Sequence, residues 1–256
     1  MMNQKAKELN LVNTHFVTPH GLDNTDHYTT PYELAILTDY ALENSKFAKI
    51  VNTNTCTITI NNSPIVLNNT NELLGALNGV NGVKTGFTNN AGRCLVTSTT
   101  RNGWQIVVVV LGADTKRNRT KDSISLIEYT FKNYEIVNIK DKLKSSFNNE
   151  KKKQEALIEI EKGKNDKIIL ELGEISNTEY PIKNSELKNL TCNIDVVHYI
   201  KAPIKEGTVV GNLEVMLGDK NISNVNILCK YTVDKKGVWD YFSDLVCNIG
   251  KYILEI

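Results

Sequence analysis

The feature that most constrains the fold is a run of β-favouring sequence over residues 82–112, interrupted twice by turn residues. The first turn is Asn89-Asn90-Ala91-Gly92 and the second is Asn102-Gly103. An Asn-Gly dipeptide between apolar runs is the strongest short-range signal for a two-residue hairpin. The run therefore predicts three consecutive antiparallel strands. The unbroken apolar stretch over residues 106–111 predicts that the last strand is buried on both faces.

Helical signals flank these strands. Thr30, Pro31 and Glu33 occupy the N-cap, N1 and N3 positions of a helix expected to reach about Asn44. After the strands, an apolar stripe at helical spacing consists of Ile124, Ile127, Phe131 and Tyr134. It predicts an amphipathic helix that covers the sheet.

Two shorter elements precede the strands. Residues 1–9 favour a helix but have no capping residue ahead of them and no apolar core of an export signal, so the chain is expected to start inside an element. A small hairpin is predicted over residues 57–67, because β-branched runs flank the turn sequence Asn61-Asn62-Ser63-Pro64.

The composition shifts to Lys, Asn and Glu over residues 140–166, although residues 156–158 still favour a strand. This shift predicts a domain boundary near Lys140, dividing the chain into residues 1–139, 140–237 and 238–256. Short β-rich runs separated by turn residues predict a small all-β domain in the second part. These runs are residues 168–172, 193–200, 208–217 and 221–231.

The last segment, Val238 to Ile256, has one apolar stripe at helical spacing. The stripe consists of Trp239, Phe242, Leu245, Val246, Ile249, Tyr252, Ile253 and Ile256. Two interpretations stay open. The helix lies in a membrane interface, with its aromatic rings at headgroup depth, or it is a terminal helix docked on the β-rich domain.

Composition excludes several classes of function. Thirty Lys and Arg against 29 Asp and Glu leave a net charge of +1, so nucleic-acid binding by phosphate neutralisation is not expected. Five dispersed cysteines form no Cys-x-x-Cys pair, and His15, His20 and His27 fit no zinc spacing. We therefore expect loop histidines with structural roles, and neither a metal nor an organic cofactor.

Lys84-Thr85-Gly86 is the most informative triplet, at the first predicted strand. A strand edge of this kind can pair with an extended peptide. The Lys supplies positive charge, the Thr hydroxyl can donate to a carboxylate, and the Gly lets a substrate backbone approach closely. The alternative is an ordinary strand whose Lys points to solvent.

The triplet does not stand alone, because the chain resembles the serine D-alanyl-D-alanine carboxypeptidases, the low-molecular-mass penicillin-binding proteins. The resemblance follows the family's order through residues 2–9, 13–16, 19–23, 27–30, 69–74, 82–88, 91–95 and 110–113. It implies an α+β fold, namely the second half of a β-lactamase/transpeptidase-like α/β sandwich with an antiparallel sheet. A small all-β domain and a C-terminal amphipathic helix are expected to follow.

The resemblance also implies roles for individual residues. Lys84 and the Phe87 backbone N–H would serve catalysis, the latter as an oxyanion-hole donor. Substrate binding would involve Thr85, Gly86, Thr88 and Arg119. Thr85, Thr88 and Arg119 would contact the substrate's terminal carboxylate, with Arg117 as the nearby competitor for the role of Arg119.

Family members carry Ser-x-x-Lys and Ser-x-Asn motifs before Lys-Thr-Gly. Here these patterns occur only at residues 185–188 and 146–148, after Lys84, so we do not expect them to be catalytic. The resemblance thus predicts an N-terminally truncated member that is inactive alone, with the signal peptide and both motifs encoded upstream.

The intact enzyme would act on peptidoglycan pentapeptides through a serine acyl-enzyme and bind β-lactams. It would be extracytoplasmic and associated with the cell envelope. The rival hypothesis is a non-catalytic peptidoglycan-binding or regulatory module.

Overall fold

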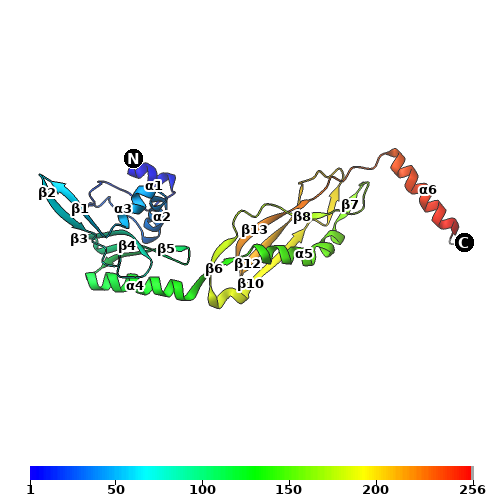
Figure 1. Ribbon diagram of the computed structural model, residues 1–256. Helices are drawn as coiled ribbons and strands as arrows, with labels where there is room; N and C mark the ends of the chain where they lie inside the picture. Colours follow the sequence, from blue (N-terminus) through cyan, green and yellow to red (C-terminus); the bar gives the residue numbers. More distant parts are fainter. Residues whose placement is uncertain (255–256) are drawn as a thin grey trace. The chain divides into compact units, whose positions relative to one another are not determined.

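The computed structural model describes residues 1–254, and its description of side chains covers residues 1–246 (Figure 1). The chain divides into two compact units, Met1–Lys132 and Asn133–Ile256. Each unit is described by itself. The compositional boundary near residue 140 stays a prediction.

The first unit is built on an antiparallel sheet in the order β3-β4-β5, formed by β3 (Val80–Thr88), β4 (Gly92–Arg101) and β5 (Trp104–Ala113). The three predicted strands are confirmed. Asn102 and Gly103 have φ angles of 51° and 79°. Both values are positive, as a type I′ hairpin turn requires.

The prediction that β5 is buried on both faces is wrong. Only Val108 is buried in this strand, while Val107 and Val109 are partly buried. β5 forms an edge of the sheet, so the apolar run has less cover than a central strand would have. A continuous apolar run cannot by itself distinguish the two situations.

Helices lie on both sides of this sheet (Figure 1). On one side, α2 (Pro31–Leu42) begins as predicted, with the Thr30 hydroxyl accepting a hydrogen bond from the Glu33 N–H. On the other, α4 (Lys116–Asn133) buries Ile127 completely and begins earlier than its apolar stripe suggests. α1 (Met2–Glu8) has no side-chain cap, as expected.

Two further elements complete the first unit. The sequence did not reveal α3 (Ser45–Val51), a short helix capped by the Asn44 side chain. The predicted hairpin is confirmed as β1 (Thr55–Ile60) and β2 (Ser63–Asn68), almost all of whose residues are exposed.

The second unit has a four-stranded antiparallel sheet in the order β10-β12-β13-β8, with two smaller strand pairs, β7 with β11 and β6 with β9. Its strands are β6 (Tyr134–Asn138), β7 (Glu159–Glu161), β8 (Leu170–Leu172), β9 (Glu179–Lys183), β10 (Leu190–Val196), β11 (Tyr199–Lys201), β12 (Val209–Leu217) and β13 (Lys220–Cys229). The predicted β-rich character of this region is confirmed.

This unit also contains α5 (Lys140–Leu157) and a short 3₁₀ helix, η1 (Asn184–Asn189). The strand predicted at residues 156–158 is wrong, because Ala156 and Leu157 complete α5. α5 buries Leu143 and Phe147 in the core of the unit. Most other positions of α5 are polar, so its sequence shows little helical periodicity.

The amphipathic segment forms α6 (Val238–Leu254), as predicted up to Leu254. Ile256, the last position of the predicted stripe, lies outside the described residues. The exposed apolar side chains of α6 include Trp239, Phe242 and Leu245. No helix within residues 1–254 is long and apolar enough to cross a membrane.

Candidate functional site

A cavity of about 640 Å³ opens along β3 in the first unit. Its lining is formed by His20, Gly21, Thr70, Lys84, Thr85, Gly86, Phe87, Thr88, Ala91, Arg93, Cys94, Lys116 and Arg119. The six residues that the sequence nominated as site residues therefore surround one cavity. They come from β3 and from α4, which are separated in the chain by two strands.

β3 brings residues 84–88 to the cavity because it is an edge strand whose second half is exposed or only partly buried. Val83 is buried beneath the sheet, and Lys84 is exposed. The hydroxyl of Thr85 lies 2.6 Å from the hydroxyl of Thr70, and the Arg93 guanidinium lies over the Phe87 ring at 3.6 Å from its centroid. An edge strand presents backbone groups to which an extended peptide can bind.

The segment before β3, residues 69–73, runs beside this strand and is fixed by Asn71. The Asn71 side chain is almost fully buried, donates to the Gly82 carbonyl at 2.9 Å and accepts from the Leu73 N–H at 3.2 Å. Because Asn71 is fixed, Thr70 and Glu72 on either side of it are held in place. In the sequence, this segment stands out only by its resemblance to the carboxypeptidase family.

Thr88 connects the end of β3 to the loop over residues 20–23. Its hydroxyl donates to Asp23 Oδ1 at 2.5 Å and accepts from the Ala91 N–H at 3.0 Å. The carboxylate of Asp23 thus orients a hydroxyl that lines the cavity. Sequence reasoning did not identify this role of Asp23.

Glu33 anchors residues 13 and 14, where the segment that leads to this loop begins. This carboxylate accepts hydrogen bonds from the Asn13 N–H at 2.9 and 3.0 Å and from the Thr14 hydroxyl at 2.5 Å. Burial raises the pKa of the Glu33 carboxyl, but the hydrogen bonds from Thr14 and Asn13 outweigh burial and lower the pKa below its ordinary value.

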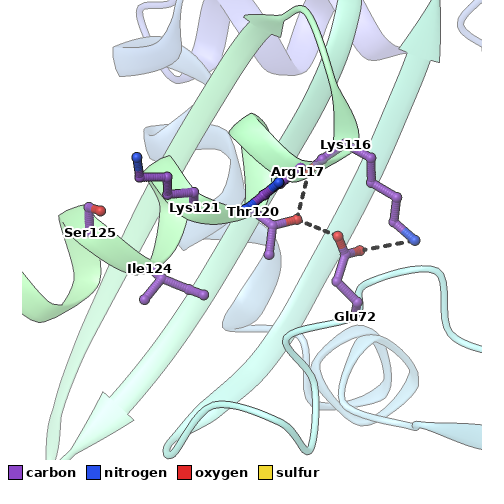
Figure 2. Close-up of a pocket in the computed structure, with 7 residues that line it drawn as sticks. All are labelled: Glu72, Lys116, Arg117, Thr120, Lys121, Ile124 and Ser125. Atoms are coloured by element: carbon purple, nitrogen blue, oxygen red, sulfur yellow. Dashed lines mark hydrogen bonds and ion pairs between the residues drawn. The ribbon is translucent and has the colours of Figure 1, made fainter.

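Arg119 reaches the cavity from α4, and its side chain is almost completely buried. Its Nη2 donates to both carboxylate oxygens of Glu72 at 2.7 Å, and its Nε has no hydrogen-bond partner among the described residues. Glu72 also accepts from the Thr120 hydroxyl and lies 3.8 Å from Lys116 Nζ (Figure 2). Glu72 was missed, since it is 47 positions from Arg119 and belongs to no periodic pattern.

Burial also raises the pKa of the Glu72 carboxyl. The hydrogen bonds from Thr120 and Arg119 outweigh burial, so the pKa lies below its ordinary value and Glu72 is ionised at neutral pH. The negatively charged carboxylate of Glu72 therefore contacts the buried guanidinium of Arg119 directly.

Arg117, the competitor of Arg119, lines a neighbouring cavity of about 650 Å³ beside α4. Figure 2 shows the lining of this second cavity, which includes Glu72, Lys116 and Ile124. Lys116 lines both cavities, and Arg117 does not line the one along β3. The position of Arg119 is therefore the better one for a ligand held against β3.

The two serine patterns lie elsewhere, and of the three candidate histidines His20 lines the cavity along β3. Ser185 belongs to η1 and Ser146 to α5, both in the second unit. His15 Nδ1 lies 2.6 Å from the Asp26 carbonyl, and His20 Nδ1 accepts from the Leu22 N–H. In the part of the chain that the structure describes, no group of three or more His, Cys, Asp or Glu side chains could hold a metal ion.

The cavity along β3 combines features suited to one kind of ligand. Lys84, Arg93, Lys116 and Arg119 supply positive charge, and Thr85 adds a hydroxyl beside a strand edge. Guanidinium and ammonium groups form strong, charge-assisted hydrogen bonds with carboxylates. The arrangement can therefore hold the carboxylate end of an extended peptide.

Comparison with known proteins identifies both units. Residues 1–115 match the family described as D-alanyl-D-alanine carboxypeptidase, and residues 147–235 match the C-terminal domain of penicillin-binding protein 5. The two matches follow each other along the chain.

Curated relatives agree with these matches. D-alanyl-D-alanine carboxypeptidase DacF of Bacillus subtilis is 29% identical over 242 residues, which cover 92% of this chain and 58% of DacF. The DacC enzyme of Escherichia coli is 31% identical over 259 residues, covering 94% of this chain and 58% of DacC. The chain thus spans 58% of the length of these two relatives.

Solved structures show the same fold. Penicillin-binding protein 5 of Haemophilus influenzae aligns with a TM-score of 0.65 at 25% identity, covering 91% of this chain and 65% of that one. The D-alanyl-D-alanine carboxypeptidase DacD of Francisella tularensis aligns with a TM-score of 0.67 at 24% identity, covering 92% and 67%. The curated relatives and solved structures align over more than nine-tenths of this chain, and together with the two family matches they show that it is similar to the D-alanyl-D-alanine carboxypeptidases, the low-molecular-mass penicillin-binding proteins.

Proposed function

We propose that the first unit forms the carboxylate-binding wall of a site that removes the terminal D-Ala from peptidoglycan pentapeptides. The observation that carries this proposal is the single cavity shared by β3 and Arg119. Arg119 and Thr85 hold the terminal carboxylate, and Thr88 joins them when its hydroxyl turns from Asp23 to the ligand. β-Lactams occupy the same wall as substrate analogues.

The remaining residues of the wall have complementary roles. Gly86 has no side chain, so a substrate backbone can approach β3 closely at this position. Lys84 contributes positive charge, and the backbone N–H of Phe87 is one donor to the oxyanion of the tetrahedral intermediate. No metal or organic cofactor is required by this chemistry.

We further propose that these 256 residues bind the ligand but do not form an acyl-enzyme by themselves. Acyl transfer needs a serine within hydrogen-bond reach of its base and beside the oxyanion donors. The only Ser-x-x-Lys and Ser-x-Asn patterns in this sequence, at Ser185 and Ser146, lie in the second unit.

Two measurements on the 256-residue chain test the proposal. A fluorescent penicillin is expected to leave no covalent label, and a stable label would contradict the assignment of the nucleophile. In an NMR titration, N,N′-diacetyl-L-Lys-D-Ala-D-Ala is expected to shift the signals of residues along β3. The Thr85→Val variant should weaken this binding several-fold, whereas Thr57→Val, on the exposed β1, should not. The absence of any binding would overturn the proposal.

We also propose that α6 attaches the protein to a membrane surface on the outside of the cell, where peptidoglycan is located. Val238 and Trp239 are 84% and 82% exposed, so the apolar stripe of α6 is available for such a contact. A helix with Trp on an exposed apolar face suits the headgroup region of a bilayer.

A further inference from the structure

Residues 69–73 touch both groups of the proposed carboxylate-binding wall. Thr70 contacts the hydroxyl of Thr85, and Glu72 binds the guanidinium of Arg119. Asn71, between them, is fixed to the backbone of β3. One short segment therefore determines how two ligand-binding groups are presented to the cavity.

The Glu72 carboxylate occupies Arg119 in the way that a ligand's carboxylate would. Both oxygens of Glu72 share the Nη2 of Arg119, which is only 3% exposed. A ligand carboxylate at the same guanidinium would lie close to a second negative charge. Like charges a few Å apart repel each other, and burial of the guanidinium reduces screening by water.

The Glu72 carboxylate keeps two other partners when Arg119 binds a ligand. The Thr120 hydroxyl donates to it, and Lys116 Nζ lies 3.8 Å away on a side chain that is 64% exposed and free to move closer. Lys116 lines both cavities, so it can approach Glu72 without leaving the site. An exchange of partners is thus available at a moderate cost.

We propose that Glu72 is a specificity-determining residue, a built-in carboxylate that competes with the ligand's terminal carboxylate for Arg119. It neutralises the buried guanidinium in the empty site and lowers the affinity for acid ligands. This inference rests on the proposed function, because it assumes that Arg119 binds a ligand carboxylate.

The test compares an acid ligand with its amide on the 256-residue chain. Dissociation constants are measured by NMR titration for N,N′-diacetyl-L-Lys-D-Ala-D-Ala and for its C-terminal amide. In Glu72→Gln the preference for the acid over the amide is expected to rise at least about threefold, as loss of a like charge a few Å away predicts even in well-solvated surroundings. Amide affinity should stay unchanged.

Glu128→Gln is the matched control. It removes the same charge from the first unit and breaks a second Arg–Glu pair, in which Arg101 contacts Glu128 at 2.6 and 3.1 Å. Glu128 lines neither cavity, so its variant should keep the wild-type preference. Glu72→Asp retains the carboxylate and should also stay near the wild-type preference.

A measurement on the wild-type chain, which does not need Glu72→Gln, covers the case in which that variant does not fold. In the wild-type chain labelled with ¹³C at Glu carboxyls, the acid ligand should shift the Glu72 signal as Arg119 changes partner, and the amide should not. The signal is assigned from its absence in Glu72→Asp.

The outcomes separate the two proposals. If the wild type and Glu72→Gln both bind acid and amide equally, Arg119 does not bind the ligand's carboxylate, which overturns the proposed function and the inference with it. A wild-type preference for the acid that is unchanged or reduced in Glu72→Gln leaves the function standing and overturns the inference alone. If the acid ligand binds and the Glu72 signal does not shift, the inference alone is likewise overturned.

Discussion

The carboxylate of Glu33 joins α2 to residues 13 and 14 of the first unit. Its side chain does not cap the helix. Its backbone N–H donates to the Thr30 hydroxyl, and its carboxylate accepts hydrogen bonds from Asn13 and Thr14. Its folded-state pKa lies below the ordinary value of 4.5. The corresponding stability is therefore complete above about pH 4.5 and is lost as the pH falls through the folded pKa.

This linkage predicts the behaviour of Glu33→Gln. At pH 7 the variant should unfold at a lower denaturant concentration than the wild type, and the difference should shrink below about pH 4.5 as Glu33 becomes protonated in the wild type. Urea titrations at several pH values measure it. Glu43→Gln, at the exposed end of α2, is the control, and equal pH profiles for Glu33→Gln and wild type would refute the assigned role.

At the residue scale, the sequence predicted what local spacing or resemblance can reveal. The Thr30 N-cap and Pro31 at the first helical position depend on neighbouring residues and are confirmed, whereas the Glu33 side chain binds Asn13 and Thr14 and does not complete the capping box. Pairing of Glu72 with Arg119 depends on how two distant segments meet, and no local pattern encodes it. The roles assigned to Lys84 and Phe87 stay predictions.

At the scale of elements, the helices and strands that could be predicted from the sequence were those with strong turn or cap signals. β3, β4 and β5 were predictable because Asn102-Gly103 fixes a hairpin turn between strands of high β-propensity. α5 was not, since a helix that buries only two side chains in a Lys-rich sequence has a weak periodic pattern. Packing of Leu143 and Phe147 in the core of the unit supplies stability that the periodic pattern does not reveal.

α6 supports a prediction about membranes. In a Trp104→Phe background, where Trp239 is the remaining tryptophan, vesicles containing anionic lipid are expected to shift the fluorescence maximum to the blue. Replacing Phe242 and Leu245 by Ser should abolish the shift. Unchanged emission in the presence of vesicles would favour the alternative, a helix that docks on protein.

At the scale of the whole molecule, the two units differ in their apolar cores. The second unit has one continuous cluster of buried side chains that includes Leu143, Leu213 and Ile227. In the first unit the buried side chains form two small clusters, one around Leu95 and one around Val83. Since apolar burial is the main stabilising contribution, the first unit should be the less stable.

This difference predicts the behaviour of the separated units. Residues 133–256 should unfold in a single cooperative thermal transition, whereas residues 1–132 should unfold broadly, bind a hydrophobic dye and aggregate. Calorimetry and dye fluorescence measure both. A sharp transition for residues 1–132 would contradict the prediction and favour the non-catalytic module, which must fold stably without further catalytic segments.

The open edge of β3 has a consequence for the chain in solution. Backbone groups that can bind an extended substrate can equally bind β3 of another copy of the chain, because backbone hydrogen bonds along an edge do not depend on side-chain identity. Concentrated samples are therefore prone to edge-to-edge oligomers. A tripeptide ligand bound along β3 would occupy this edge and reduce the formation of such oligomers.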